Sequence, residues 1–346
     1  MARRAGCRHP GHRSLSRVAV VSASRLGGRL EILAAAALFS TGAAAIKTTT
    51  LSAWQVAGFR SALAALTLTL VLWRRGRLDR LVRLGRAPWI GLVYALALTG
   101  YVVANKLTTA ANTVLLLSTA PIWVAVLSPG LLGERPSRRD LALLALVAAG
   151  MALVLGASTD PVETAPDPVL GNRVAAAAAL FWALTLIGLR RLSRGEAAGA
   201  DADGSLALAG VVWGNSLAFF LTLPLALPVE RLECGDAAAV GYLGTVQIGA
   251  AYLFLVAGLT RVPAVEVSLL LLLEPVLNPV WAWLLHGEVP AGGAILGGGV
   301  ILSALALRLR LDAGGAVSPT PPTPEPAQLS AAGSAERGGA EGEIGQ

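Results

Sequence analysis

Ten long apolar segments dominate this 346-residue chain and restrict the folds open to it. Segments of about 17 to 24 apolar residues match the length that an α-helix needs to cross the ~30 Å hydrocarbon core of a bilayer. Because each backbone amide in lipid must be hydrogen-bonded within the protein, we predict an all-α integral membrane protein with ten transmembrane helices. The segments lie at about residues 30–48, 51–73, 87–105, 109–132, 139–157, 170–190, 206–228, 237–259, 262–285 and 289–309.

The composition agrees with this assignment. The chain is 55% hydrophobic and 14% charged, whereas about a quarter of the residues in a soluble domain are charged.

The distribution of Lys and Arg predicts the orientation of the chain in the membrane, because basic residues favour cytoplasmic connections. Seven Arg precede residue 30 and six lie between Arg74 and Arg86, while the alternate connections contain Lys47, Lys106 and Arg231. This asymmetry predicts that both termini are cytoplasmic, and it assigns the net charge of +7 to orientation in the membrane rather than to nucleic acid.

The two ends of the chain differ from the apolar segments. Residues 1–29 are rich in Arg, and residues 310–346 consist mainly of Ala, Gly, Pro, Ser and Glu. Because neither end can bury a core, we expect both to be disordered cytoplasmic tails.

Two 16-residue stretches reveal an internal repeat. PIWVAVLSPGLLGERP begins at Pro121 and PVLNPVWAWLLHGEVP begins at Pro275, and both contain a Gly-Glu pair, at Glu134 and at Glu288. Equivalent residues are 154 positions apart. The repeat predicts two five-helix halves, at residues 30–157 and 170–309.

Five helices are an odd number, so the second half enters the membrane from the opposite side to the first. Such an inverted repeat is typical of transporters that alternate access to a site near the middle of the membrane. We expect an outer linker at residues 158–169 to join the halves.

The sequence of residues 30–309 resembles the EamA-type transporters of the drug/metabolite transporter superfamily. The resemblance rests on the two-half layout, on Arg60 in QVAGFRSALAALTL, and on the runs PIWVAVLSPGLLGERPS and LLLLEPVLNPVWAWLLHGEVP. It implies a secondary carrier of small metabolites in the cell membrane, most often an exporter of amino acids or related compounds, with proton exchange as an energy source. The first segment departs from the family pattern, because Phe39 to Gly42 replace a common Trp-Gly, while Trp182 holds the aromatic position in the second half.

Glu274 is an acid about twelve residues into the ninth apolar segment. An ionised carboxylate near the bilayer centre costs about 2.5 to 3.5 kcal/mol on insertion scales, so a compensating role is expected. Three roles remain open: binding substrate or protons, pairing with Arg60, or hydrogen-bonding a neighbouring helix or a carbonyl that Pro275 leaves unbonded.

Arg60 also has three possible roles. It can bind a substrate carboxylate, serve as a fixed counter-ion, or extend its side chain to the membrane–water interface.

Other polar residues occupy helical faces that could line a cavity. Tyr94, Tyr101 and Asn105 share one face of the third segment, and Glu266, Asn278 and Trp281 share the face of Glu274. Gln247 and Tyr252 offer hydrogen-bonding groups in the eighth segment. Each of these residues can also act as a packing contact between helices.

Glu134 and Glu288 lie at the ends of segments. We interpret both as structural residues that order the loops, as we do Pro121 and Pro275, and the alternative for the two acids is a role in gating. Glycines 297 to 299 allow close helix approach, including the approach of a second copy in a homodimer.

Enzymatic chemistry finds no support in the sequence. Two Cys and three His offer no metal cluster, and no GxxxxGK[ST] phosphate loop is present, so we predict a protein without cofactor or enzymatic activity. The alternative to transport is a receptor, a scaffold or a lipid translocator with the same fold.

Overall fold

The structure is a computed structural model that describes part of the chain. The described residues are 11–82, 87–108, 110–156, 166–197 and 203–286, with residues 296, 299, 300, 303 and 307. All of them belong to a compact unit, Met1–Arg308, which is distinct from the unit Leu309–Gln346. The expected C-terminal tail, Glu288, most of the tenth segment and most of the linker therefore lie outside the described residues.

Within the described ranges the protein is helical and contains no strand. The first half forms α1 (Gly11–Ser40), α2 (Gly42–Lys47), α3 (Ala53–Arg74), α4 (Asp79–Val82), α5 (Ala87–Leu107), α6 (Ala110–Leu117), α7 (Ala120–Leu131) and α8 (Arg138–Gly156). The second half forms α9 (Pro168–Ala197), α10 (Ser205–Ala226), α11 (Cys234–Tyr242), the π-helix η1 (Leu243–Ala250), α12 (Ala251–Leu259), α13 (Ala264–Leu270) and α14 (Leu273–His286).

Six helical stretches are long and apolar enough to cross a membrane. They are Arg25–Lys47, Ala53–Arg74, Trp89–Leu107, Pro168–Arg194, Ser205–Ala226 and Cys234–Leu259. The protein is thus an all-helical membrane protein, while the number of ten spans and the side on which the termini lie stay predictions. Helix α1 begins at Gly11, inside the segment expected to be a tail.

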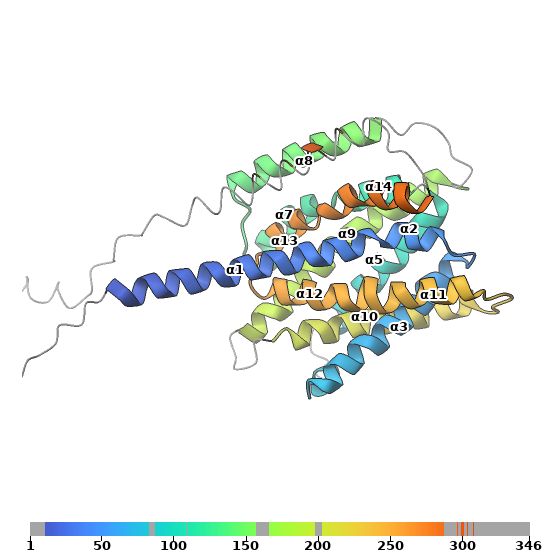
Figure 1. The fold of residues 1–346 in the computed structure, drawn as a ribbon, viewed down its shortest axis with the longest axis horizontal. Helices are drawn as coiled ribbons and strands as arrows, with labels where there is room; N and C mark the ends of the chain where they lie inside the picture. The colour runs from blue at the N-terminus through green and yellow to red at the C-terminus, as the bar shows by residue number, and fades with distance from the viewer. Residues whose placement is uncertain are drawn as a thin grey trace, which may run out of the picture. The chain divides into compact units, whose positions relative to one another are not determined.

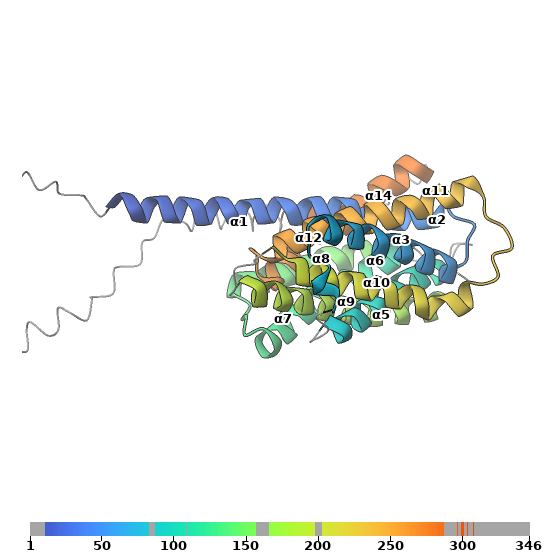
Figure 2. The same cartoon turned by 90° about the horizontal axis from the view of Figure 1, so that it is seen from below.

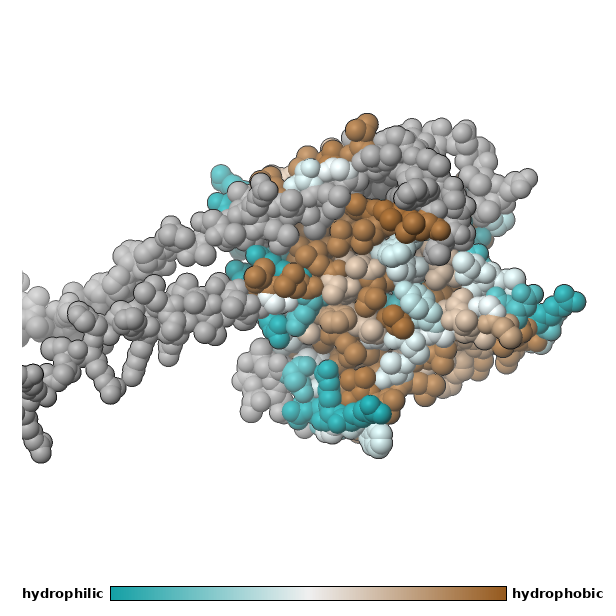
Figure 3. Space-filling view, in the orientation of Figure 1, coloured by the Kyte–Doolittle hydropathy of each residue, from teal (hydrophilic) through white to brown (hydrophobic). Residues whose placement is uncertain are grey.

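The long helices run along a common direction, and the first turns of α1 project beyond them (Figures 1 and 2). α5 packs against α9, α10 packs against α3 and α5, and α1 lies along α12, so helices from the two halves interleave. Hydrophobic residues cover the middle of the face in Figure 3, and hydrophilic residues gather toward its ends, as a bilayer requires. Large apolar side chains exposed on the helices include Leu66, Leu70, Leu92, Leu96, Phe220, Leu221 and Leu225.

Polar residues fix the starts of two of the long helices. Ser52 and Gln55 form a capping box at α3, in which the Gln55 backbone N–H donates to the Ser52 hydroxyl at 3.3 Å and the Ser52 N–H donates to the Gln55 side chain at 3.0 Å. The Asp167 carboxylate accepts from the Leu170 backbone N–H at 3.0 Å as α9 begins. Such caps satisfy backbone donors that the first turn leaves unbonded, so they define where each helix begins.

The fourth and ninth apolar segments are interrupted helices. One interruption separates α6 from α7, just before Pro121, and the other separates α13 from α14, just before Pro275. A proline has no N–H to bond the carbonyl of the preceding turn, which accounts for an interruption at both places. Pro121 and Pro275 are 154 residues apart, so the two interruptions occupy equivalent positions in the sequence repeat.

Candidate functional site

A cavity lies where the two halves of the bundle meet. It encloses about 520 Å³ of space not occupied by atoms, part of it open to solvent. α1, α3, α5 and α6 of the first half line it together with α9, η1, α12 and α14 of the second. The lining residues are Phe39, Arg60, Tyr94, Ala97, Leu98, Tyr101, Leu117, Trp182, Gln247, Ile248, Tyr252 and Glu274.

Five of the eight candidate site residues line this cavity: Glu274, Arg60, Tyr94, Tyr101 and Gln247. They come from four different elements, so the fold brings together residues that are far apart in the sequence. Their roles in binding or coupling stay predictions.

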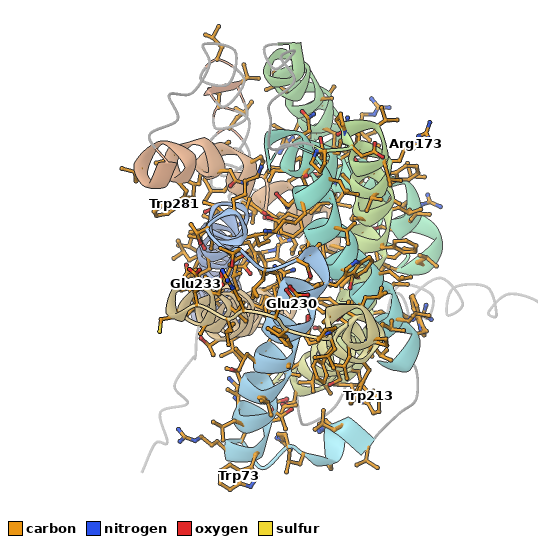
Figure 4. The ribbon with its side chains drawn as sticks, turned by 90° about the vertical axis from the view of Figure 1, so that its right-hand side faces the viewer. Trp73, Arg173, Trp213, Glu230, Glu233 and Trp281 are labelled. Carbon is orange, nitrogen blue, oxygen red and sulfur yellow. The ribbon has the colours of Figure 1, made fainter. Side chains whose placement is uncertain are left out.

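The other three candidates are not among the lining residues of the cavity. Asn105 lies one turn beyond Tyr101, and its side-chain amide donates to the Tyr101 carbonyl at 3.0 Å. Asn278 lies one turn beyond Glu274, and its Nδ2 is buried without a hydrogen-bond partner among the described residues. Trp281 lies on α14 (Figure 4) and donates from Nε1 to the Ser40 hydroxyl at 2.8 Å, which ties α14 to the end of α1.

Glu274 lies in the first turn of α14, directly after the interruption. Its backbone N–H donates to the Leu271 carbonyl at 3.0 Å, and no side chain or backbone group among the described residues donates to its carboxylate. The positive end of the α14 dipole favours an anion at this position. Glu274 also borders a second pocket, of about 350 Å³, between α6, α9 and α13. Glu274 therefore lines two adjoining pockets.

Arg60 is the cationic residue of the cavity. Its residue exposure is 1%, and its Nη2 donates one long hydrogen bond, 3.4 Å, to the Leu98 carbonyl. Nε and Nη1 are buried and make no hydrogen bond within the described part of the chain. The guanidinium carbon lies 5.8 Å from the centroid of the Tyr101 ring, a cation–π distance. No ion pair joins Arg60 to Glu274 among these residues, although both line the same cavity.

Four aromatic rings form a connected wall of the cavity. The Tyr252 ring lies 5.3 Å from the Phe39 ring, 5.3 Å from the Tyr94 ring and 6.3 Å from the Trp182 ring, all in edge-on geometry. Such contacts restrict ring movement, because each ring edge meets the face of another. Asn215 of α10 also donates to the Tyr94 hydroxyl at 3.0 Å. The wall is thus held by four separate helices.

Gln247 reaches the cavity from the π-helix η1. Single turns of π-helix rotate the residues that follow and are frequent at functional sites. The Gln247 amide donates to the Phe39 carbonyl at 3.4 Å, and its Oε1 is buried with no partner in the described ranges. Gly42 makes this approach feasible, because a Cβ on Gly42 would lie 2.6 Å from Gln247 Nε2. The interruption between α1 and α2 is therefore packed against the cavity.

Glu134 lies away from the cavity, where it joins three elements. Its carboxylate accepts from Arg190 Nε at 3.0 Å, from Arg194 Nη1 at 3.4 Å, and from the Ala264 backbone N–H at 3.0 Å as α13 begins. Arg190 also donates to the Leu259 carbonyl. These contacts support the structural role expected for Glu134.

Further ion pairs lie near the same ends of these helices. Arg29 of α1 donates to Glu266 of α13 at 2.6 Å, and both side chains are less than a tenth exposed. Arg261 donates to Glu31 at 2.9 Å. Glu266 is therefore engaged with α1 and does not line the Glu274 cavity, because the helix is interrupted between the two acids.

The sequence did not identify Phe39 and Trp182 as residues of the site. Aromatic residues in an apolar segment have the same pattern whether they face lipid, core or cavity. The one signal in the sequence is the repeated hexamer AAAALF, which places Phe39 and the residue before Trp182 at equivalent positions in the two halves.

Comparisons with known proteins agree with this architecture. The EamA-like transporter family matches the chain twice, at residues 26–156 and at residues 169–310, which together exceed half of its length. The members of this family are transporters, so the protein is a membrane transporter of small molecules rather than an enzyme.

The fold also matches solved structures. One of them, described only as the crystal structure of a protein, aligns with a TM-score of 0.64 at 22% identity, over 84% of this chain and 97% of the other. No curated protein matches the sequence. The two consecutive family matches coincide with the two halves of the bundle, and the chain belongs to the EamA-like transporter family.

Proposed function

We propose that this protein is a secondary active transporter that exports amino acids or related small metabolites across the cell membrane in exchange for protons. The observation that carries the proposal is the cavity between the two halves, which an acid, Glu274, and a buried base, Arg60, line without forming an ion pair with each other. Buried charges without partners are costly, and in membrane proteins they mark transport pathways.

The interrupted helices support alternating access. The two interruptions, before Pro121 and before Pro275, occupy equivalent positions in the repeats and adjoin the pockets that contain Glu274. An interrupted helix can bend with little loss of hydrogen bonding, because Pro121 and Pro275 have no N–H to donate a bond across the interruption. Bending at these points would open the cavity first to one side and then to the other.

The ion pairs around Glu134 and Glu266 would hold one end of the bundle closed. They connect α1 to α13 and the Glu134 loop to α9, which are elements that must separate if that end is to open. In the predicted orientation this end is cytoplasmic.

Glu274 is the proposed proton carrier. A carboxyl group in a water-poor cavity is neutral when protonated and costly when charged, so the two forms favour different arrangements of the bundle. Release of the proton to one side and of the substrate to the other would then couple the two movements.

Flux into proteoliposomes tests this function. Purified protein would be reconstituted and offered a pool of labelled amino acids and other small metabolites, with and without an imposed pH gradient, beside protein-free vesicles. We expect gradient-stimulated uptake of a few compounds. If folded, inserted protein moves no compound, a receptor, scaffold or lipid translocator of the same fold becomes the better account.

A further inference from the structure

We infer that the smaller pocket beside Glu274 is a second binding site, which takes a small monovalent metal cation of the Na⁺ type. The pocket lies at the two helix interruptions, between α6, α9 and α13, and is distinct from the larger cavity. The inference goes beyond the proposed function, because it concerns a different ligand in a different pocket. The two sites share one carboxylate, since Glu274 lines both pockets.

Two serine hydroxyls supply oxygen ligands. Ser118 and Ser268 line the smaller pocket, and both residues are less than a tenth exposed. The Ser118 hydroxyl donates to the Val114 carbonyl at 2.7 Å, and the Ser268 hydroxyl donates to the Val265 carbonyl at 2.8 Å. Because each hydroxyl uses its proton within its own chain segment, its oxygen lone pairs remain available. The two serines therefore offer acceptors rather than donors to a ligand.

Backbone carbonyls at the interruptions add further oxygens. Pro121 and Pro275 have no N–H to donate across the interruptions. The carbonyls four residues earlier, those of Leu117 and Leu271, therefore lose the donor that a continuous helix supplies. The Glu274 N–H donates to the Leu271 carbonyl at 3.0 Å, which leaves that oxygen a second lone pair. All five residues line the pocket, and carbonyls of interrupted helices coordinate ions in transporters with inverted repeats.

The charge of the pocket selects a cation with a single charge. Glu274 is the one ionisable residue described as lining it, and the equivalent position in the first half, 154 residues earlier, is Ala120. The ends of α6 and α13 and the starts of α7 and α14 meet here, so the helix dipoles oppose one another and the carboxylate decides the sign. One monovalent cation leaves the site neutral, whereas Mg²⁺ would leave a positive charge that a bilayer disfavours.

A proton and the cation compete for the Glu274 carboxylate, because only its ionised form attracts a cation. The other titratable residues that line the larger cavity are Arg60 of α3, Tyr94 and Tyr101 of α5, and Tyr252 of α12. None of these four is among the residues described as lining the smaller pocket. Glu274 is therefore the point where the two ligands meet, and cation binding is best measured at one fixed, alkaline pH.

Thermal unfolding of the purified full-length protein in detergent tests the site. The melting temperature would be measured at constant ionic strength while NaCl replaces choline chloride, because choline is too large to be surrounded by these oxygens. We expect Na⁺ to raise the melting temperature in a saturable way and MgCl₂ at the same ionic strength to add nothing. Equal melting temperatures in NaCl and choline chloride would overturn the inference. Stabilisation by Mg²⁺ as large as that by Na⁺ would overturn the assignment to a monovalent ion.

Substitutions assign the Na⁺ response to this pocket. Glu274→Gln should abolish the response, and Ser118→Ala and Ser268→Ala should each raise the half-saturating Na⁺ concentration about tenfold, because each removes one oxygen from a charged ligand. Ser303→Ala is the matched control and should leave the response unchanged. The Ser303 hydroxyl also donates to a carbonyl four residues earlier, that of Gly299 at 2.7 Å, but Ser303 is exposed and does not line the pocket. If Glu274→Gln does not fold, the two serine variants decide.

A Na⁺ response that persists unchanged in the pocket variants would overturn the inference. Absence of any Na⁺ response, in protein whose flux follows a pH gradient, would also overturn it and would leave the proposed transport function intact. A Na⁺ response that the pocket variants weaken, in protein that moves no solute, would support the cation site while contradicting the transport function.

Discussion

At the residue scale, the site depends on close approaches that only small residues permit. A Cβ on Gly244 of η1 would lie 2.6 Å from the Leu63 Cβ and 2.7 Å from the Arg60 carbonyl oxygen. The backbone of the second half therefore touches α3 next to the buried cation, and the position of Arg60 depends on that contact. Gly241, three residues earlier, has open space where its Cβ would lie.

These two glycines make a matched pair for a stability test. Ala at an unobstructed helix position gains about 1 kcal/mol over Gly, so Gly241→Ala should leave the melting temperature unchanged or raise it. Gly244→Ala should lower it, because overpacking costs about 1–3 kcal/mol. Thermal unfolding in detergent measures both variants. Equal effects of the two substitutions would contradict the close packing of η1 on α3.

Glu134 provides a second test at the same scale. Glu134→Gln keeps the shape of the side chain but removes the charge that Arg190 and Arg194 contact. We expect the variant to lose about 1–3 kcal/mol of stability, because the Arg190 side chain is largely buried and would lose its counter-charge. Glu230→Gln, at an exposed acid between α10 and α11 (Figure 4), is the control and should be neutral. A neutral Glu134→Gln would remove the structural role assigned to that residue.

At the scale of elements, the interrupted helices distinguish this bundle from a set of simple spans. Apolar length is a direct signal, and it predicted the six helical stretches that are long enough to cross a membrane, while the total of ten spans stays a prediction. It did not predict the interruptions or η1, because apolar content does not reveal where backbone hydrogen bonds fail. For the same reason it placed Glu266 on the face of Glu274, whereas the interruption assigns Glu266 to an ion pair with Arg29.

Only part of the candidate site could be found from the sequence. Polar residues in apolar segments are conspicuous, so Glu274, Arg60 and Gln247 could be found from the sequence. Tyr94 and Tyr252 of the aromatic wall could be found for the same reason. Phe39 and Trp182 could not, since they resemble core residues until the tertiary contacts are known.

Pro275→Ala tests the importance of the interruption. With an N–H restored, α13 and α14 can join into one continuous helix, and an interior helix position gains about 3 kcal/mol when Pro is replaced. We expect the variant to remain folded, to be at least as stable as the wild type, and to transport much more slowly in proteoliposomes. Pro129→Ala is the control, because Pro129 lies inside α7 and away from the interruption. Unchanged flux in Pro275→Ala would show that the interruption is not part of the transport movement.

At the scale of the whole molecule, the predicted orientation can be tested with a native thiol. Cys234 is exposed as α11 begins, at the end of the bundle predicted to face outward. In a background with Cys7→Ser, a membrane-impermeant maleimide should label Cys234 in intact cells. Leu78→Cys, placed in the exposed connection between α3 and α4 of a chain without native cysteines, should be labelled only after permeabilisation. The opposite pattern would reverse the orientation.

Proton coupling through the cavity is the central claim about the whole molecule, and Glu274→Gln tests it most directly. Uptake of a transported solute into proteoliposomes would be measured with and without a pH gradient for the wild type, for Glu274→Gln and for Glu230→Gln. We predict that the gradient accelerates uptake by the wild type and by Glu230→Gln, while Glu274→Gln loses this response but still exchanges solute at equilibrium. A folded Glu274→Gln variant that responds to the gradient as the wild type does would contradict the claim.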